Sequence, residues 1–278
     1  MTTLEFKDVV KDYTLRNGLK ASTLRAVDHV SFTLAPGRTV ALVGQSGSGK
    51  STIAKLLMQL ERPTSGEILV DGRPMQRRGA GLRQYRKAVQ MVFQDPFASL
   101  NPYHTVGHHL ARPITLHHPE YSRTQVRARV LELLARVRLD PAQEYVDRRP
   151  HELSGGQRQR VAIARALAPG PGILVADEPV SMLDVSIRLG VLNLLATLQR
   201  EEDLGVLYIT HDLATARHFS DEIMVLYRGA VVERGPADDV ILNPQHPYTK
   251  LLAEAAPDPE RRLAELNGGV RDDDAVPA

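Results

Sequence analysis

A glycine-rich segment between an apolar strand and an amphipathic helix constrains the fold of this 278-residue chain more than any other feature. The run Val40–Val43 is wholly apolar, which predicts a buried strand. From Thr52 to Leu60, apolar residues recur at the spacing of one helix face. Between them lies a stretch of the form G-x-x-x-x-G-K-[ST], from Gly44 to Ser51. This order of strand, glycine-rich loop and helix predicts an α/β fold whose loop binds phosphate groups.

The residue types of this loop suit a phosphate ligand. Its glycines let successive backbone N–H groups curl around phosphate oxygens, and the helix N-terminus adds a positive dipole. Lys50 can reach the β- and γ-phosphates of a nucleotide, and Ser51 can ligate Mg²⁺. A Gly/Ser turn before an ordinary helix is the alternative, but the register of the strand, Lys50 and Ser51 favours phosphate. The expected phosphate-binding residues are Gly44, Gln45, Ser46, Gly47, Ser48, Gly49, Lys50, Ser51 and Thr52.

Two adjacent carboxylates end a second apolar strand. Ile173–Ala176 is followed directly by Asp177 and Glu178. Neighbours on a strand point to opposite sides, so we expect the two carboxylates to have different tasks. Asp177 is placed to hold the Mg²⁺ shell, and Glu178 to orient or deprotonate the water that attacks the γ-phosphate. A pair of solvated acids is the alternative, which the phosphate-binding loop in the same sheet disfavours.

A third segment, Leu153-Ser154-Gly155-Gly156-Gln157, precedes the predicted helix Arg158–Leu167. Ser154 and Gln157 have the spacing of a capping box, S-x-x-Q. The two glycines leave backbone donors open, and the helix dipole makes this end attractive to an anion. An ordinary capped helix without a ligand explains the cap, but it does not explain the whole pentapeptide.

The pattern along the chain predicts an α/β core that is interrupted by a helical insertion. Leu4–Val9 and Val27–Leu34 alternate apolar and polar residues at period two, which predicts strands, and Arg16–Lys20 is expected to form an exposed hairpin loop between them. The insertion has its clearest helix after Ser122, where Ser122 and Gln125 fit a capping box. Strands alternate with helices again after Ile173, which implies parallel pairing.

These patterns give expected boundaries. The nucleotide-binding core with an N-terminal antiparallel β subdomain is expected over residues 1–95 and 170–240, and the helical subdomain over 96–169. Residues 241–278 are expected to form a C-terminal extension whose tail, with the acidic run after Arg271, is frayed.

Composition excludes several classes of protein. The chain has no cysteine, which excludes disulfides, thiolate zinc sites, cysteine-ligated iron–sulfur clusters and cysteine nucleophiles. Its 35 Lys+Arg and 33 Asp+Glu leave a formal charge of +2 without a long basic block, so no nucleic-acid partner is expected. The first residues do not have the pattern of a signal peptide, and no window approaches 18 uninterrupted apolar residues. The cytoplasm is therefore the expected compartment.

Taken together, the segments GQSGSGKST, LSGGQ and VADEP resemble those of the nucleotide-binding subunits of ATP-binding-cassette (ABC) transporters. The resemblance extends from about Leu4 to Leu252 and implies ATP and Mg²⁺ as ligands on a P-loop core. It also implies that Ser154, Gly155, Gly156 and Gln157 close over ATP that is held by a second subunit.

The same resemblance assigns roles to three further residues. Gln94 resembles the glutamine that joins the Mg²⁺ site to the membrane partner, and His211 the histidine that senses the γ-phosphate. Tyr13 corresponds to the aromatic residue that stacks on adenine. The expected catalytic residues are thus Glu178, His211 and Gln94, and the expected metal ligands are Ser51, Gln94 and Asp177. Leu183-Asp184 resembles the loop that links the two composite sites, with Met182 where alanine is usual.

A narrower resemblance points to the oligopeptide/dipeptide/nickel importer group. It is carried by Gln94–Pro102, Asp177–Ser181 and Asn243–Leu252. The last segment has no nucleotide chemistry, and its pattern predicts a proline-rich turn followed by a short amphipathic helix. Many members of this group carry C-terminal cysteines that ligate an iron–sulfur cluster, and this chain has none.

Five histidines in the insertion invite comparison with nickel ligands. The alternative is that they are ordinary solvated residues, which is favoured because the stretch is polar and punctuated by prolines, and because no carboxylate pattern accompanies them. They are His104, His108, His109, His117 and His118.

The expected function is that of an ATPase subunit powering import at the cytoplasmic face of the membrane. It would form half of an ATP-sandwich dimer with a second ATP-binding subunit, which is either a copy of this chain or a paralogue. The dimer would act on two permease subunits, to which an external binding protein delivers the substrate. Peptides, nickel chelates and other small solutes remain open as substrates.

Two alternative functions fit the sequence less well. A soluble cassette ATPase acting in DNA repair or on ribosomes usually carries a long coiled-coil insertion or two cassettes, whereas this chain has one copy of each motif. A nucleotide-binding module that has lost hydrolysis is disfavoured because Glu178 and His211 are present.

Overall fold

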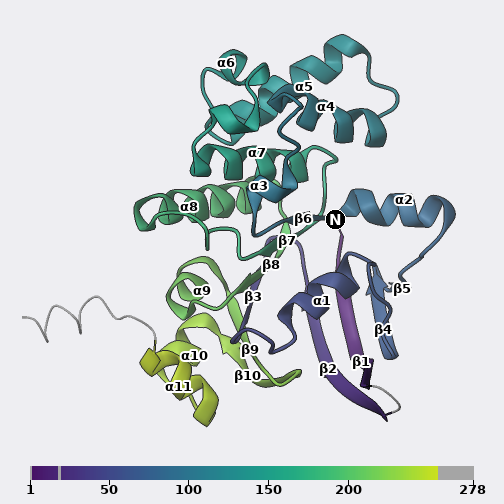
Figure 1. The fold of residues 1–278 in the computed structure, drawn as a ribbon, viewed down its shortest axis with the longest axis vertical. Coiled ribbons are helices and arrows are strands. Elements are labelled where there is room, and N and C mark those ends of the chain that lie inside the picture. The colour runs from purple at the N-terminus through teal and green to yellow at the C-terminus, as the bar shows by residue number, and fades with distance from the viewer. Residues whose placement is uncertain (1, 18–19, 256–278) are drawn as a thin grey trace, which may run out of the picture.

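The computed structural model describes residues 2–17 and 20–255 of the chain. A six-stranded sheet of order β10-β9-β3-β8-β7-β6 forms its centre (Figure 1). All neighbouring strands in it are parallel except β10, which pairs antiparallel with β9. The predicted α/β class is confirmed. The strands are β3 (Thr39–Val43), β6 (Val89–Val92), β7 (Ile173–Asp177), β8 (Gly205–Thr210), β9 (Glu222–Tyr227) and β10 (Ala230–Pro236).

A second, antiparallel sheet has the order β2-β1-β4-β5. Its strands β1 (Leu4–Asn17) and β2 (Lys20–Leu34) are much longer than the alternating patterns predicted. The ladder continues to the pair Asn17 and Lys20, so the expected hairpin loop Arg16–Lys20 was wrong at both ends, and residues 18–19 lie outside the described part. Cross-strand pairs such as Thr14 with Thr23 continue the ladder up to this last described pair. The sheet is completed by β4 (Ser65–Val70) and β5 (Arg73–Pro74).

Between β6 and β7 the chain is mostly helical, and these helices lie together at one end of the molecule (Figure 1). Both predicted capping boxes are confirmed: Ser122 Oγ accepts from the backbone N–H of Gln125 at 3.3 Å, and Ser154 Oγ from that of Gln157 at 3.2 Å. The helix after Ser154 therefore begins earlier than expected. The elements are α3 (Pro96–Ser99), α4 (Val106–His117), α5 (Arg123–Arg136), α6 (Ala142–Val146), a 3₁₀ turn (Pro150–Glu152) and α7 (Gly155–Leu167).

The remaining helices flank the two sheets. The helix after the glycine-rich loop ends at Leu57 rather than at Leu60, and Gln59 beyond it adopts a left-handed φ of 57°. The acidic run after Arg271 lies outside the described residues. The helices are α1 (Lys50–Leu57), α2 (Gly79–Ala88), α8 (Val185–Glu201), α9 (Leu213–Phe219), α10 (Ala237–Leu242) and α11 (Pro247–Ala255).

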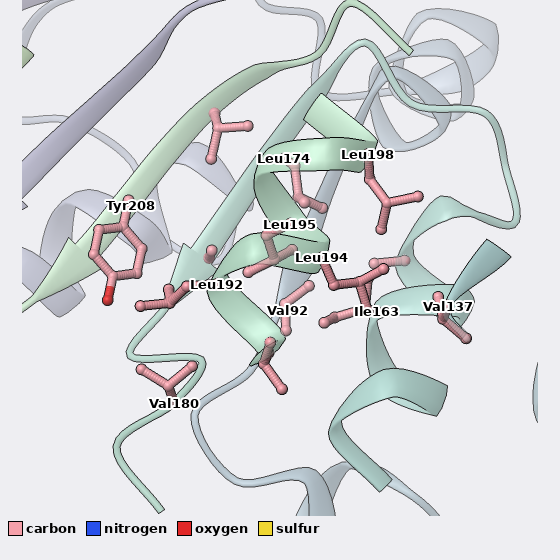
Figure 2. Packing of buried hydrophobic residues seen from close by; sticks show 14 of the residues in the cluster. Val92, Val137, Ile163, Leu174, Val180, Leu192, Leu194, Leu195, Leu198 and Tyr208 are labelled. Atoms are coloured by element: carbon pink, nitrogen blue, oxygen red, sulfur yellow. The ribbon is translucent and has the colours of Figure 1, made fainter. Parts of the chain in front are cut away.

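The central sheet is covered on both faces, which explains why its strands β3 and β8 are buried along their whole length. Along β7, Leu174 and Ala176 belong to the core cluster that contains the helices of the insertion. Ile173 and Val175 belong to the cluster shared with α1 and the antiparallel sheet. Figure 2 shows the first cluster, in which the leucines of α8 gather between Leu174 and the insertion. Alternate side chains of β7 therefore pack into two different clusters on opposite faces of the sheet.

No helix in the described ranges combines the length and apolar character needed to cross a membrane.

Candidate nucleotide site

Four neighbouring strands of the central sheet deliver the candidate residues to one edge. The glycine-rich loop follows β3, Gln94 lies just after β6, Asp177 ends β7, and His211 follows β8. Because these strands are parallel, their carboxyl ends meet along the same edge, where α/β sheets commonly bind ligands. A cavity of about 910 Å³ opens there. Of the predicted residues it is lined by Tyr13, Ser46, Gly47, Gly49, Lys50, Ser51, Thr52, Gln94, Asp177, Glu178 and His211.

The loop is held in a tight conformation around the Lys50 side chain. Lys50 Nζ donates hydrogen bonds to the carbonyl oxygens of Gly44 and of Gln45, the latter at 3.0 Å. Burial lowers the pKa of Lys50, while the charges of Glu178 and Asp177 act to raise it. Gly49 has φ 115°, and a Cβ there would lie 2.3 Å from a backbone carbonyl oxygen of β2, so only glycine fits. Gly44, Gln45 and Ser48 belong to the same loop without lining the cavity.

The carboxylates of Asp177 and Glu178 both reach this cavity. The alternation of side chains along a strand does not extend to this pair, because β7 ends at Asp177 and Glu178 adopts a left-handed φ of 44°. Glu178 Oε2 accepts a hydrogen bond from Gln94 Nε2 at 3.0 Å, and Oε1 lies 3.1 Å from His211 Nδ1. Gln94 and His211 thereby fix the orientation of the Glu178 carboxylate.

Asp177 has a different environment from Glu178. Burial raises the pKa of Asp177, the charge of Glu178 raises it further, and Lys50 acts in the opposite direction. A half-buried carboxylate that faces more negative than positive charge is suited to a cation, because a cation relieves both the desolvation and the repulsion.

Tyr13 lies on β1 at the rim of the cavity. Its cross-strand partner on β2 is Leu24, which also lines the cavity and is 51% exposed. Lys11 Nζ lies 4.8 Å from the centroid of the Tyr13 ring, so one face of the ring has a cationic neighbour. Tyr13 and Leu24 together give the rim an apolar surface.

Five lining residues were not predicted from the sequence: Leu24, Arg25, Ala26, Arg228 and Gly229. The first three lie on β2 and are brought to the cavity by the pairing of β2 with β1, the strand that carries Tyr13. The last two form the turn after β9. Gly229 N–H donates to the carbonyl oxygen of Ser48 at 2.8 Å, which ties this turn to the loop. The dipeptide Arg228-Gly229 after an apolar strand is the sequence signal that could have predicted this turn.

The segment Ser154–Gln157 lies at the start of α7 and does not line the cavity. The Ser154 hydroxyl and the Gln157 side chain serve the capping box, and Gln157 Nε2 also lies 3.4 Å from Tyr145 Oη. A Cβ on Gly156 would approach Ile187 of α8 to 2.7 Å. Within one chain, this segment and the phosphate-binding loop are therefore not brought together.

A second cavity, of about 880 Å³, opens beside the first, with Gln94 and Asp177 lining both. Its other walls come from β6, α3, α4 and α7, and include His104, His108 and His109. The rings of His104 and His108 stack with centroids 4.0 Å apart, and His109 Nε2 lies 3.0 Å from the carbonyl oxygen of Asn101. In the part of the chain that the structure describes, no three His, Asp or Glu side chains gather as a metal-ligand set.

Residues 27–181, more than half of the chain, match the family model described as ABC transporter. The chain belongs to the ABC transporter family. The ATP-binding cassette and its ATPase class follow from this membership. Residues 232–277 of the ABC chain match a second model, described as the C-terminal region of oligopeptide/dipeptide transporters.

Curated relatives of this ABC chain are similar over most of its length. The dipeptide transport ATP-binding protein DppF of Escherichia coli is 43% identical over 95% of this chain and 80% of its own. The oligopeptide transport ATP-binding protein OppF of Salmonella typhimurium is 44% identical over 94% of this chain and 79% of its own. The glutathione import ATP-binding protein GsiA of Pectobacterium atrosepticum is 46% identical, but the ABC chain spans only 42% of its length.

Solved structures agree with the fold. CbiO1 from Clostridium perfringens, part of an ABC transporter complex, superposes with a TM-score of 0.75 at 27% identity, covering 86% of this chain and 90% of its own. A dimeric bacterial ABC transporter cassette superposes with a TM-score of 0.71 at 32% identity, covering 84% of this chain and 98% of its own.

Proposed function

We propose that this chain is the ATP-hydrolysing subunit of a membrane importer for peptides or related small solutes. ATP hydrolysis is supported above all by the position of the Glu178 carboxylate. Gln94 and His211 hold this carboxylate at the cavity beside the phosphate-binding loop. The substrate class is supported by the match of residues 232–277 and by relatives named for dipeptide, oligopeptide and glutathione transport. These names give no support for nickel.

The loop would bind the triphosphate of ATP. Its backbone N–H groups and the N-terminus of α1 supply donors, and Lys50 supplies the cation for the β- and γ-phosphates. Tyr13 and the neighbouring Leu24 offer the apolar surface on which the adenine would stack.

The residues present fit a bound Mg²⁺ ion. Asp177, the Ser51 hydroxyl and the Gln94 amide oxygen line one cavity, and oxygen donors are the ligands that Mg²⁺ prefers. The raised pKa of Asp177, caused first by burial, reflects a carboxylate that a cation would relieve. When bound, Mg²⁺ supplies positive charge that offsets the phosphate oxygens.

The hydrolytic step would be assisted by Glu178. Its carboxylate would accept a hydrogen bond, and then a proton, from the water that attacks the γ-phosphate. Gln94 and His211 each contact one carboxylate oxygen, so they hold Glu178 in place for this task. We assign His211 the further role of contacting the γ-phosphate.

A second ATP-binding subunit would complete each site. Because Ser154–Gln157 and the phosphate-binding loop do not meet within one chain, the glycine-flanked start of α7 is free to close over ATP held by a partner. The second cavity, lined by Gln94 and the insertion, would receive a cytoplasmic segment of one of the two permease subunits. The chain would then sit at the cytoplasmic face of the membrane, with an external binding protein delivering the substrate.

Reconstitution in vesicles tests this function. The chain, its second ATP-binding subunit and the two permeases should take up a labelled peptide only with external binding protein and internal ATP, and Lys50→Ala should abolish uptake. Stimulation of ATP hydrolysis by DNA or ribosomes, but not by the permeases, would favour the soluble cassette ATPase instead. Uptake of a nickel chelate without peptide uptake would correct the substrate class.

A further inference from the structure

The C-terminal segment that carries no nucleotide chemistry of its own contacts the phosphate-binding loop directly. Tyr248, in the first turn of α11, accepts a hydrogen bond on its hydroxyl oxygen from the backbone N–H of Gln45 at 3.0 Å. The two residues are 203 positions apart in sequence. Tyr248 is only 8% exposed, so the hydrogen bond is largely shielded from water.

Helix α11 is docked by several contacts rather than by this hydrogen bond alone. The ring of Tyr248 packs on Tyr227 at the end of β9, with centroids 4.2 Å apart. Glu233 of β10 accepts hydrogen bonds from the backbone N–H groups of Gln245 and His246 at 2.8 and 2.9 Å, just before the helix begins. The helix is thereby held on β9 and β10 at this edge of the central sheet. These contacts fix the position from which the Tyr248 hydroxyl reaches the loop.

The contacted N–H shares a peptide plane with a carbonyl that holds Lys50. The N–H of Gln45 and the C=O of Gly44 belong to one planar peptide unit and, in the trans form, point in opposite directions. Tyr248 contacts one edge of this unit and the Lys50 ammonium the other. Gln45 also holds Lys50 through its own carbonyl, and that oxygen accepts from the Ser48 N–H at 3.2 Å. Rotation of the peptide plane would break both contacts together.

We propose that Tyr248 is a positioning residue of the phosphate-binding loop, fixing the Gly44–Gln45 peptide and through it Lys50. This inference rests on the proposed nucleotide site. It gives the C-terminal segment a role in ATP affinity, since loss of the hydroxyl frees the loop to adopt conformations that must be reordered when ATP binds. By reciprocity, ATP binding stabilises the docked position of α11.

A pair of tyrosine variants in the full chain separates this role from packing. Tyr248→Phe removes only the hydroxyl on the loop, whereas Tyr227→Phe removes the hydroxyl of the ring stacked against it, which makes no hydrogen bond to the described residues. The dissociation constant for MgATP should rise about two- to tenfold in Tyr248→Phe, the effect expected for one hydrogen bond. It should be unchanged in Tyr227→Phe.

Deuterium exchange at the Gln45 amide supplies a readout that packing alone would not move. Exchange should be faster in Tyr248→Phe than in the parent and in Tyr227→Phe, and ATP should slow exchange in α11 of the parent. Parental affinity and parental Gln45 exchange in Tyr248→Phe would overturn the proposal, as would a lowered melting temperature with an unchanged dissociation constant. A parent that does not bind MgATP would instead overturn the proposed nucleotide site.

Discussion

His211 Nδ1 lies 3.1 Å from Glu178 Oε1, although the two residues follow different strands of the central sheet. The contact is possible because β7 and β8 are parallel neighbours, so the residues that follow them share one edge. It places an imidazole and a carboxylate together at the cavity of the phosphate-binding loop.

Glu178→Gln should retain ATP binding while slowing hydrolysis by about 10²–10⁴, the range for loss of a positioned general base. The amide keeps the size of the side chain but cannot accept the proton of the attacking water. Single-turnover hydrolysis and equilibrium ATP binding measure the two effects. Glu67→Gln, at an exposed position on β4, serves as the control. Hydrolysis at the parental rate in the Glu178 variant would remove Glu178 from its assigned role.

Lys50→Ala should abolish measurable ATP affinity or turnover, because it removes the side-chain cation expected to contact the β- and γ-phosphates. Tyr13→Ala should have a smaller effect, since base stacking contributes only about 1–3 kcal/mol. Binding of a fluorescent ATP analogue ranks the two variants. Lys55→Ala, on an exposed position of the same helix, is the matched control. A larger loss at Tyr13 than at Lys50 would reverse the ranking and contradict the assignment.

Asp177→Asn should stabilise the nucleotide-free chain while abolishing Mg²⁺-dependent hydrolysis. Burial, and then Glu178, raises the pKa of Asp177, so the folded state binds its proton more tightly than the unfolded state does. Ionisation of Asp177 therefore lowers stability as the pH rises through the folded-state pKa, and acid restores that stability. The neutral amide should raise the melting temperature at neutral pH, by about 2–4 °C per kcal/mol removed, and less in acidic buffer.

Thermal unfolding at two pH values measures this gain. Asp147→Asn, at an exposed position after α6, is the control and should leave the melting temperature near that of the parent. A melting temperature below the parental value in Asp177→Asn would show that the carboxylate stabilises the chain through Lys50 instead.

The isolated chain should be a weak ATPase and largely monomeric, because Ser154–Gln157 would complete a site in a second subunit. In the Glu178→Gln background, ATP should shift the mass measured by light scattering toward a dimer if the chain can pair with itself. The same variant with Lys50→Ala added should remain monomeric. The absence of an ATP-dependent shift would indicate an obligatory paralogous partner, and a stable dimer without nucleotide would contradict the sandwich arrangement.

Gln94→Ala should lower substrate uptake and permease-stimulated hydrolysis far more than basal ATP binding, since Gln94 lines both cavities and precedes the insertion. Uptake and ATP turnover in reconstituted vesicles, compared with equilibrium ATP binding, measure this difference. Gln143→Ala, exposed on α6, is the matched control. Equal uptake by the Gln94 variant and the parent would end the coupling role, and lost uptake in His117→Ala would support metal binding by the histidines.

Features that depend on a few consecutive residues could be predicted from the sequence. Both capping boxes, at Ser122 and Ser154, were identified because a serine and a glutamine three residues later form a self-contained motif. The loop that ends at Lys50 was identified for the same reason. Ordered motifs along the chain then indicated the family.

Features that depend on the meeting of distant segments could not be predicted. Nothing near Glu178 shows that the chain turns to a left-handed conformation there, which is what brings two consecutive carboxylates to one cavity. Leu24 reaches the site only through the pairing of β2 with β1. The contact of Tyr248 with Gln45 depends on the docking of α11, which no local pattern in Asn243–Leu252 reveals.

The helical insertion is a single enlarged crossover between β6 and β7, which pair in parallel from Val89 with Ile173 to Val92 with Ala176. The entropy of closing such a connection grows only slowly with its length, so the strand pairing tolerates connections of very different size. The pairing of β6 with β7 therefore does not by itself fix the length of the insertion. A change in the outer surface of the insertion would leave Gln94 just after β6 and Asp177 at the end of β7, where they line the nucleotide cavity.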